Sequence, residues 1–215
     1  MRTFTLSKPL VTVFCGVVCV ISVGSYYGYV HKKTSSAPVV KIVPEVSIST
    51  TTPDETPVLK RQYPSLPQPT EPEIIRIQSV GMDALIQRVG VDQFSQVAVP
   101  TNINLAGWFT HSNSPGEVGL SVIDGHVNGK GRDGVFAKLA QVKVGDVITV
   151  ILANGTERTF HAVYVTNVPT TDAANQLFSQ LPGVKSQLNL ITCGGVYNPA
   201  VKDYTERTIV GAALN

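Results

Sequence analysis

Three residues with side chains suited to acyl-transfer chemistry stand at the edges of strand-like runs: Cys193, His126 and Arg207. Cys193 is the only cysteine outside the N-terminal apolar stretch, which contains Cys15 and Cys19. Exported domains normally pair their cysteines or have none, so a single thiol indicates chemistry. A thiolate can attack a peptide carbonyl and hold the acyl group as a thioester, which an amine can then accept. The alternative for Cys193 is a small buried apolar residue.

His126 follows Gly125 at the end of a run of small and apolar residues. Its imidazole could protonate a leaving amine and then deprotonate an incoming one near neutral pH. His111, in a loop of Ser, Asn and Pro, and His161, in a strand-like run, are assigned no chemical role. Asp124 could face the same side as His126 and stabilise an imidazolium, as in a triad. A turn-capping role for Asp124 is the expectation that we favour.

The three candidates lie in three runs that resemble the signatures of sortases, the membrane-anchored cysteine transpeptidases of Gram-positive-type bacteria. The resemblance extends from about Glu73 to Asn215, and the form Ile-Thr-Cys-Gly-Gly is most similar to class F, with class E next. The runs are Gly-Leu-Ser-Val-Ile-Asp-Gly-His-Val (119–127), Leu-Asn-Leu-Ile-Thr-Cys-Gly-Gly (188–195) and Tyr-Thr-Glu-Arg-Thr-Ile-Val-Gly-Ala (204–212).

The resemblance implies roles for particular residues. Cys193 would be the nucleophile, His126 the acid and base, and Arg207 a forked donor to the developing oxyanion. Thr192 and Gly194 would contact the bound peptide. The substrate would be a surface protein with a sorting signal similar to Leu-Pro-X-Thr-Gly, cleaved between threonine and glycine. The acceptor would be an amine of a cell-wall precursor or a pilin, and neither a metal nor another cofactor is expected.

Two other functions remain open at this point. A cysteine L,D-transpeptidase of peptidoglycan would carry Ser-His-Gly-Cys beside its nucleophile, and the Ile-Thr-Cys-Gly-Gly run disfavours it. A non-catalytic binding module on a stalk, with Cys193 incidental, leaves the three motifs without explanation. Nucleic-acid binding is disfavoured because residues 73–215 carry 10 Lys or Arg against 11 Asp or Glu, which gives no basic field.

The segments before residue 73 predict how this domain is held. Residues 9–30 contain no Asp, Glu, Lys, Arg or His and are long enough to cross a bilayer, so we expect a transmembrane anchor after a cytoplasmic N-terminus, 1–8. A cleaved signal peptide is the alternative, but no small-x-small site precedes His31. Residues 31–72, with eight prolines, predict a disordered stalk, a proline-rich ligand being the alternative. The catalytic domain is expected to be extracellular.

The remaining residues, 73–215, predict a mainly β domain: a single closed barrel with one or two short helices. Asn154-Gly155 predicts a hairpin turn between two of its strands. The helical pieces are expected at Gly134–Gln141 and Asp172–Gln180. The expected strands are Ile74–Val80, Ala84–Val91, Gly119–Asp124, Val147–Leu152, Arg158–Val168, Gln187–Thr192 and Arg207–Ala213.

Overall fold

The structure is a computed structural model that describes residues 53–58, 68–93 and 95–215. The expected N-terminus (1–8), the expected anchor (9–30) and most of the expected stalk therefore lie outside the described residues. Within the described ranges, no helix has the length and apolar character needed to cross a bilayer.

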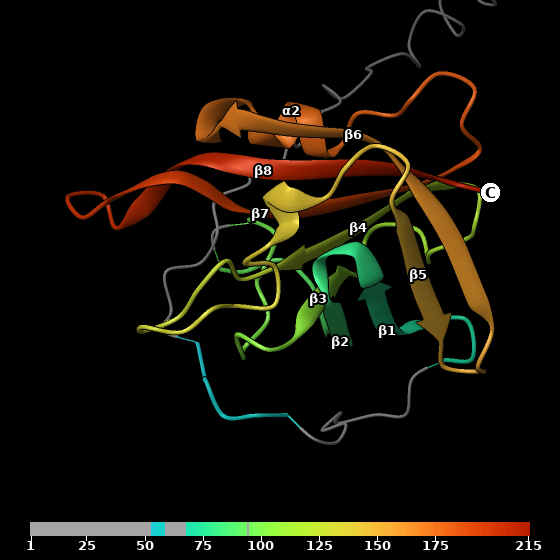
Figure 1. The fold of residues 1–215 in the computed structure, drawn as a ribbon, viewed down its shortest axis with the longest axis horizontal. Coiled ribbons are helices and arrows are strands. Elements are labelled where there is room, and N and C mark those ends of the chain that lie inside the picture. Colours follow the sequence, from blue (N-terminus) through green and yellow to red (C-terminus); the bar gives the residue numbers. More distant parts are fainter. Residues whose placement is uncertain (1–52, 59–67, 94) are drawn as a thin grey trace, which may run out of the picture. The chain divides into compact units, whose positions relative to one another are not determined.

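The strands close into one barrel, in the order β1-β2-β3-β4-β7-β8-β6-β5 (Figure 1). This confirms the predicted mainly β barrel. Its inside is filled by an apolar cluster to which all eight strands contribute, including Ile123, Leu190 and Val210. The bounds are β1 Pro72–Ile77, β2 Met82–Val89, β3 Ala106–Phe109, β4 Gly119–Gly125, β5 Val147–Leu152, β6 Glu157–Pro169, β7 Ser186–Asn198 and β8 Asp203–Leu214.

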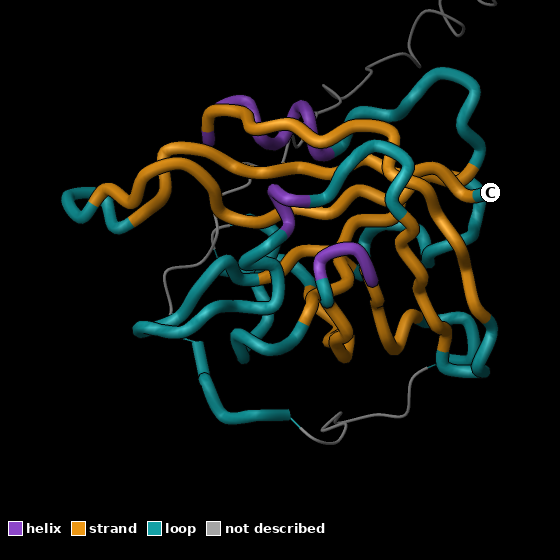
Figure 2. Tube along the Cα trace, in the orientation of Figure 1, coloured by secondary structure: helices purple, strands orange, loops and turns teal. Residues whose placement is uncertain are grey.

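Helical structure is sparse (Figure 2). The α-helix α2 covers only Ala173–Leu177, and the 3-10 turns are η1 Gln78–Val80, η2 Leu139–Gln141 and η3 Thr170–Asp172. The expected helix over Gly134–Gln141 is thus reduced to η2. The predicted turn at Asn154-Gly155 is confirmed: Gly155 has a φ of 81°, and its N–H donates to the carbonyl of Leu152 at 2.9 Å.

Most predicted strands are confirmed within a few residues, and three features differ. The four-residue β3 was not predicted, because so short a run carries too little alternation to be recognised. β7 continues six residues past Thr192, and β8 begins four residues before Arg207. The two strands pair as far as Asn198 and Asp203 and project together as a hairpin (Figure 1). Cys193 therefore lies within a strand and not at its end.

A second apolar cluster covers the outer face of β4, β7 and β8. It includes Val122 of β4, Ile191 of β7, Ile209 of β8 and Leu177 of α2. Successive side chains of a strand point to opposite faces, so these residues alternate with the inward-facing Ile123, Leu190 and Val210. The outer face of these three strands is therefore also buried over part of its length.

Residues 53–58, part of the expected stalk, contact the barrel domain. The N–H of Asp54 donates to the carbonyl of Thr101 at 2.8 Å, and the N–H of Ile103 donates to the carbonyl of Asp54 at 2.9 Å. The carboxylate of Glu55 accepts a hydrogen bond from the N–H of Lys130. Backbone pairing needs no apolar side chains, which is why composition alone did not predict this contact.

Candidate active site

The strand pairing brings the three candidate residues to one level of the barrel wall. β4 and β7 are parallel, with Asp124 opposite Ile191, so continuing both chains by two residues puts His126 level with Cys193. β7 and β8 are antiparallel, and Cys193 lies directly opposite Arg207. We call His126, Cys193 and Arg207 the outer-face row.

The position of Cys193 and Arg207 on the outer face follows from strand alternation. Cys193 is two residues after Ile191, and Arg207 is two residues before Ile209, so each shares the face of its apolar neighbour. Cys193 is partly exposed, and it is the only free cysteine in the described part of the chain. The thiol thus borders the place where the second apolar cluster ends.

His126 is held by one hydrogen bond of its ring. Nε2 lies 2.8 Å from the carbonyl oxygen of Pro100. Because a carbonyl only accepts, Nε2 carries the proton in the neutral ring, and Nδ1 is the nitrogen that is free to exchange a proton. The contact with Pro100 therefore fixes both the tautomer and the orientation of the imidazole.

Thr192, expected to contact peptide, has a buried side chain in the structure. Its hydroxyl donates to the carbonyl of Gly125 at 2.8 Å, which links the strand of Cys193 to the residue before His126. Its side chain points to the face opposite that of Cys193. Gly194, the other expected peptide contact, leaves room for a neighbour: a Cβ there would lie 2.8 Å from Oγ1 of Thr208.

Arg207 differs from the expected open fork, because its side chain is fully buried. Nη2 donates to both carboxylate oxygens of Asp203, at 2.8 and 3.0 Å. Nη1 contacts the carbonyls of Glu206 and Tyr204, at 2.9 and 3.2 Å, and Oγ1 of Thr170 at 3.3 Å. Nε is buried and has no partner among the described residues. This N–H is the one guanidinium donor left for a substrate oxygen, and because it is buried, a substrate can reach it only if the site opens.

Asp124 does not cap a turn, so that expectation is wrong. It lies inside β4, is only 3% exposed, and neither carboxyl oxygen has a hydrogen-bond partner in the described residues. A Cβ on Gly107 would lie 2.2 Å from Oδ1 of Asp124 and 2.9 Å from Cγ of Pro100. The glycine therefore makes space for the carboxyl beside the segment that holds His126.

The local electrostatics favour neutral forms of the reacting groups. Burial raises the pKa of the Cys193 thiol to about 11; Arg207 opposes this rise, and the Asp203 and Asp124 carboxyls add to it. Burial lowers the pKa of His126 from its usual 6.5, against the effect of its contact with the Pro100 carbonyl. Burial also raises the pKa of Asp124 well above its usual range. A neutral thiol beside a neutral imidazole is thus the favoured resting state.

Sequence reasoning missed Asp203, Thr170 and Pro100, which hold Arg207 and His126. Asp203 is four residues before Arg207, and residues four apart on a regular strand are about 13 Å apart at their Cα atoms. This spacing gives no signal for an ion pair on a strand. Pro100 lies in a loop and Thr170 begins η3, and only the fold brings them to the outer-face row.

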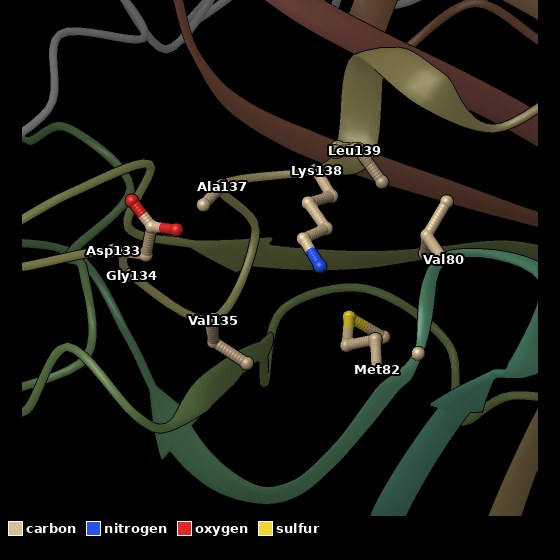
Figure 3. A pocket seen from close by; sticks show the side chains of 9 residues that line it. Val80, Met82, Asp133, Gly134, Val135, Ala137, Lys138 and Leu139 are labelled. Carbon is tan, nitrogen blue, oxygen red and sulfur yellow. The ribbon is translucent and has the colours of Figure 1, made fainter.

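A separate cavity of about 230 Å³ lies between the start of β2 and residues 133–139. Figure 3 shows the side chain of Lys138 reaching into it, with Met82, Val80 and Leu139 around it. None of its lining residues belongs to the outer-face row. In the described residues, no group of three or more His, Cys, Asp or Glu side chains could hold a metal ion.

Comparison with known proteins identifies the family. The sortase domain family matches residues 75–215, so the chain belongs to the sortase family, and it is a cysteine transpeptidase. The comparison with curated proteins gave no match.

Two solved sortase structures, with TM-scores of 0.50 and 0.51, show the same fold. Streptococcus agalactiae sortase C1, in complex with MTSET, is 16% identical with a TM-score of 0.51, covering 70% of this chain and 72% of that one. Sortase C-1 of Streptococcus pneumoniae is 19% identical with a TM-score of 0.50, covering 66% of each chain. Sortase C-1 of Actinomyces oris is 23% identical with a TM-score of 0.49, covering 66% of this chain and 72% of that one.

Proposed function

We propose that this chain is a membrane-anchored sortase that cleaves a sorting signal similar to Leu-Pro-X-Thr-Gly and transfers the new acyl end to an amine. The observation that carries this proposal is the outer-face row, in which a partly exposed thiol lies opposite a buried guanidinium and level with an imidazole. These are the groups that acyl transfer through a thioester needs. The family match argues against the stalked binding module and the L,D-transpeptidase as alternatives.

In the first half of the reaction, the Cys193 thiolate attacks the carbonyl carbon of the threonine. The carbonyl oxygen becomes an oxyanion and accepts a hydrogen bond from Nε of Arg207. The tetrahedral intermediate then collapses as the C–N bond breaks, and the His126 imidazolium gives its proton to the leaving amine. The products are a thioester on Cys193, a neutral imidazole and the released glycine-containing peptide.

In the second half, an acceptor amine attacks the thioester carbonyl and loses its proton to His126. The C–S bond breaks, and the thiolate and imidazolium are restored with a new amide as product. The directions of the two pKa shifts make this ion pair a minor form of the free enzyme. The substrate must therefore bind to that minor form or increase its population. The acceptor that we propose is an amine of a cell-wall precursor or a pilin.

A peptide library tests the substrate class. The full-length protein, in detergent, is incubated with peptides that vary each position of Leu-Pro-X-Thr-Gly, together with hydroxylamine as a small acceptor. We expect a hydroxamate at the threonine, and a large loss of product when the leucine, proline or threonine is replaced. Hydroxamate formation at an unrelated sequence would overturn the assignment of the sorting signal.

The proposed topology puts the domain outside the cell and the N-terminus in the cytoplasm. Protease treatment of intact cells tests it, since the barrel should be released from the surface without lysis. A membrane-impermeant maleimide should also label Cys193 in intact cells, because this thiol is partly exposed. Cleavage and labelling that occur only after lysis would contradict the proposed topology.

A further inference from the structure

We propose that Asp203 is a positioning residue that holds Arg207 in its donor geometry and whose charge opposes the stabilisation of the Cys193 thiolate by Arg207. No role for Asp203 follows from the three sequence motifs, which begin with Tyr204 in this part of the chain. The effect of Asp203 on turnover rests on the proposed function. Its effect on the reactivity of the Cys193 thiol can be measured without a substrate.

The first part of the inference comes from the hydrogen bonds of the guanidinium. Both carboxylate oxygens of Asp203 bind Nη2, and three protein oxygens lie around Nη1, so the plane of the group is fixed. Nε is the one nitrogen without a partner in the described residues. A guanidinium that is held in this way before the substrate arrives loses little freedom when the oxyanion forms.

The second part comes from charge. Arg207 is fully buried, and the Asp203 side chain is 25% exposed, so the pair is partly removed from water. A lone buried guanidinium would stabilise the thiolate of Cys193 opposite it, and the adjacent carboxylate opposes that effect. Asp124 on β4 acts in the same direction as Asp203, and His126 adds a charge only when protonated. The ion pair therefore gives Arg207 its orientation, while the Asp203 carboxylate opposes part of the effect of Arg207 on the thiol.

Asp203 thus has two effects, one on the position of Arg207 and one on the ionisation of Cys193, and a single substitution can reveal both. In Asp203→Asn the guanidinium keeps its charge but loses the carboxylate that binds Nη2. The thiol should then ionise more easily, while the oxyanion donor becomes less well placed. A residue needed only for folding would not raise thiol reactivity and lower turnover together.

The experiment measures iodoacetamide modification of Cys193 against pH, together with peptide turnover, on the full chain. Modification is followed on the Cys193-containing peptide by mass spectrometry, because Cys15 and Cys19 also carry thiols. For Asp203→Asn we expect the alkylation midpoint to move down by about one pH unit. We expect kcat/KM to fall by about tenfold or more. An unchanged midpoint, or an unchanged kcat/KM, would overturn the proposal.

Glu206→Gln is the matched control, because it removes one negative charge beside Arg207. The Glu206 side chain has no hydrogen bond to the guanidinium, and only its backbone carbonyl contacts Nη1. We expect wild-type alkylation and turnover in this variant. A shift as large as that of Asp203→Asn would mean that any nearby carboxylate has the same effect, which would overturn the specific role of Asp203.

Two further variants test the proposal if Asp203→Asn does not fold. Asp203→Glu keeps the charge but displaces the carboxylate, so the alkylation midpoint should stay near that of the wild type while turnover falls. In an Arg207→Met background, adding Asp203→Asn should change turnover by less than about twofold, because the residue that Asp203 positions is gone. Full turnover in Asp203→Glu, or independent losses in the double variant, would contradict the positioning role.

Discussion

The inner and outer faces of β4, β7 and β8 differ in what they bury. The inner face contributes mainly apolar residues that are almost completely buried, together with a few small polar ones such as Ser121 and Thr192. The apolar residues are Ile123, Leu188, Leu190, Val210 and Ala212. The outer face is apolar only in part. Its buried polar residues include Asp124, Gln187, Asn189 and Arg207.

The outer-face polar groups are mostly satisfied by particular partners. The Gln187 and Asn189 side chains hydrogen-bond each other at 2.9 Å and bind the carbonyls of Ser179 and Leu177, at 3.0 and 2.6 Å. These bonds hold the segment after α2 against β7. A buried polar group without a partner is costly, so the exceptions are informative.

On the outer face, the Asp124 carboxyl and Nε of Arg207 are such exceptions, and both lie at or next to the outer-face row. On the inner face, the exceptions are the uncharged hydroxyls of Ser121 and Ser186. The comparison teaches that the inner face supplies stability, while the outer face gives up some stability to hold reactive groups. Changes on the inner face should therefore act on folding, and changes in the row should act on turnover.

The largest effect on stability is expected from Leu190→Ala on the inner face. Leu190 is fully buried, and truncating it should lower the free energy of unfolding by about 2–5 kcal/mol. Cys193→Ala, three residues further on, should leave unfolding nearly unchanged and abolish turnover. Denaturant titration of both variants measures this difference. Similar losses of stability in the two variants would remove the distinction between the faces.

Arg207→Lys should reduce kcat by about a hundredfold. Lysine keeps the positive charge but has no Nε donor, and its ammonium cannot reproduce the contacts of Nη1 and Nη2 with five oxygens. The reduction should appear in kcat more than in KM, because the lost interaction forms in the transition state. Steady-state kinetics test this, and wild-type kcat in the lysine variant would refute the oxyanion role.

Thr192→Val should have a moderate effect on both stability and turnover. The variant keeps the shape of the side chain but loses the 2.8 Å hydrogen bond to the Gly125 carbonyl, at a cost of about 1 kcal/mol in unfolding free energy. Turnover should fall several-fold, because this bond ties the strand of Cys193 to the chain before His126. Thr149→Val in β5, a strand that adjoins neither β4 nor β7, is the control. Equal turnover in both variants would argue against this link.

Asp124→Asn should change stability in a way that depends on pH. Burial raises the pKa of Asp124 in the folded state, so the folded protein retains a proton that the unfolded chain loses as pH rises above its usual value near 3.8. The wild type therefore loses stability with rising pH, and the asparagine variant avoids that loss. We expect the variant to be more stable at pH 7 and nearly equal at pH 3. A wild type that is more stable at pH 7 would mean that the carboxylate has a partner.

The sequence predicted the barrel well because its strands carry alternating or continuous apolar patterns and its β5–β6 turn carries Asn154-Gly155. It predicted the row only through the resemblance to sortases, since the three residues are brought together by strand pairing between distant segments. The short β3 has no recognisable period. The burial of Arg207 and its pairing with Asp203 depend on the extended β7–β8 hairpin, which local pattern does not indicate.

Detection of the acyl-enzyme by intact-protein mass spectrometry tests the central claim most directly. The full-length wild type is incubated with a Leu-Pro-X-Thr-Gly peptide without an added acceptor amine and quenched with acid. We predict an added mass equal to the acyl group of the peptide fragment that ends at the threonine, located on Cys193 by digestion, and no adduct on Cys193→Ala. An adduct on another residue, or continued turnover by folded Cys193→Ala, would contradict the account.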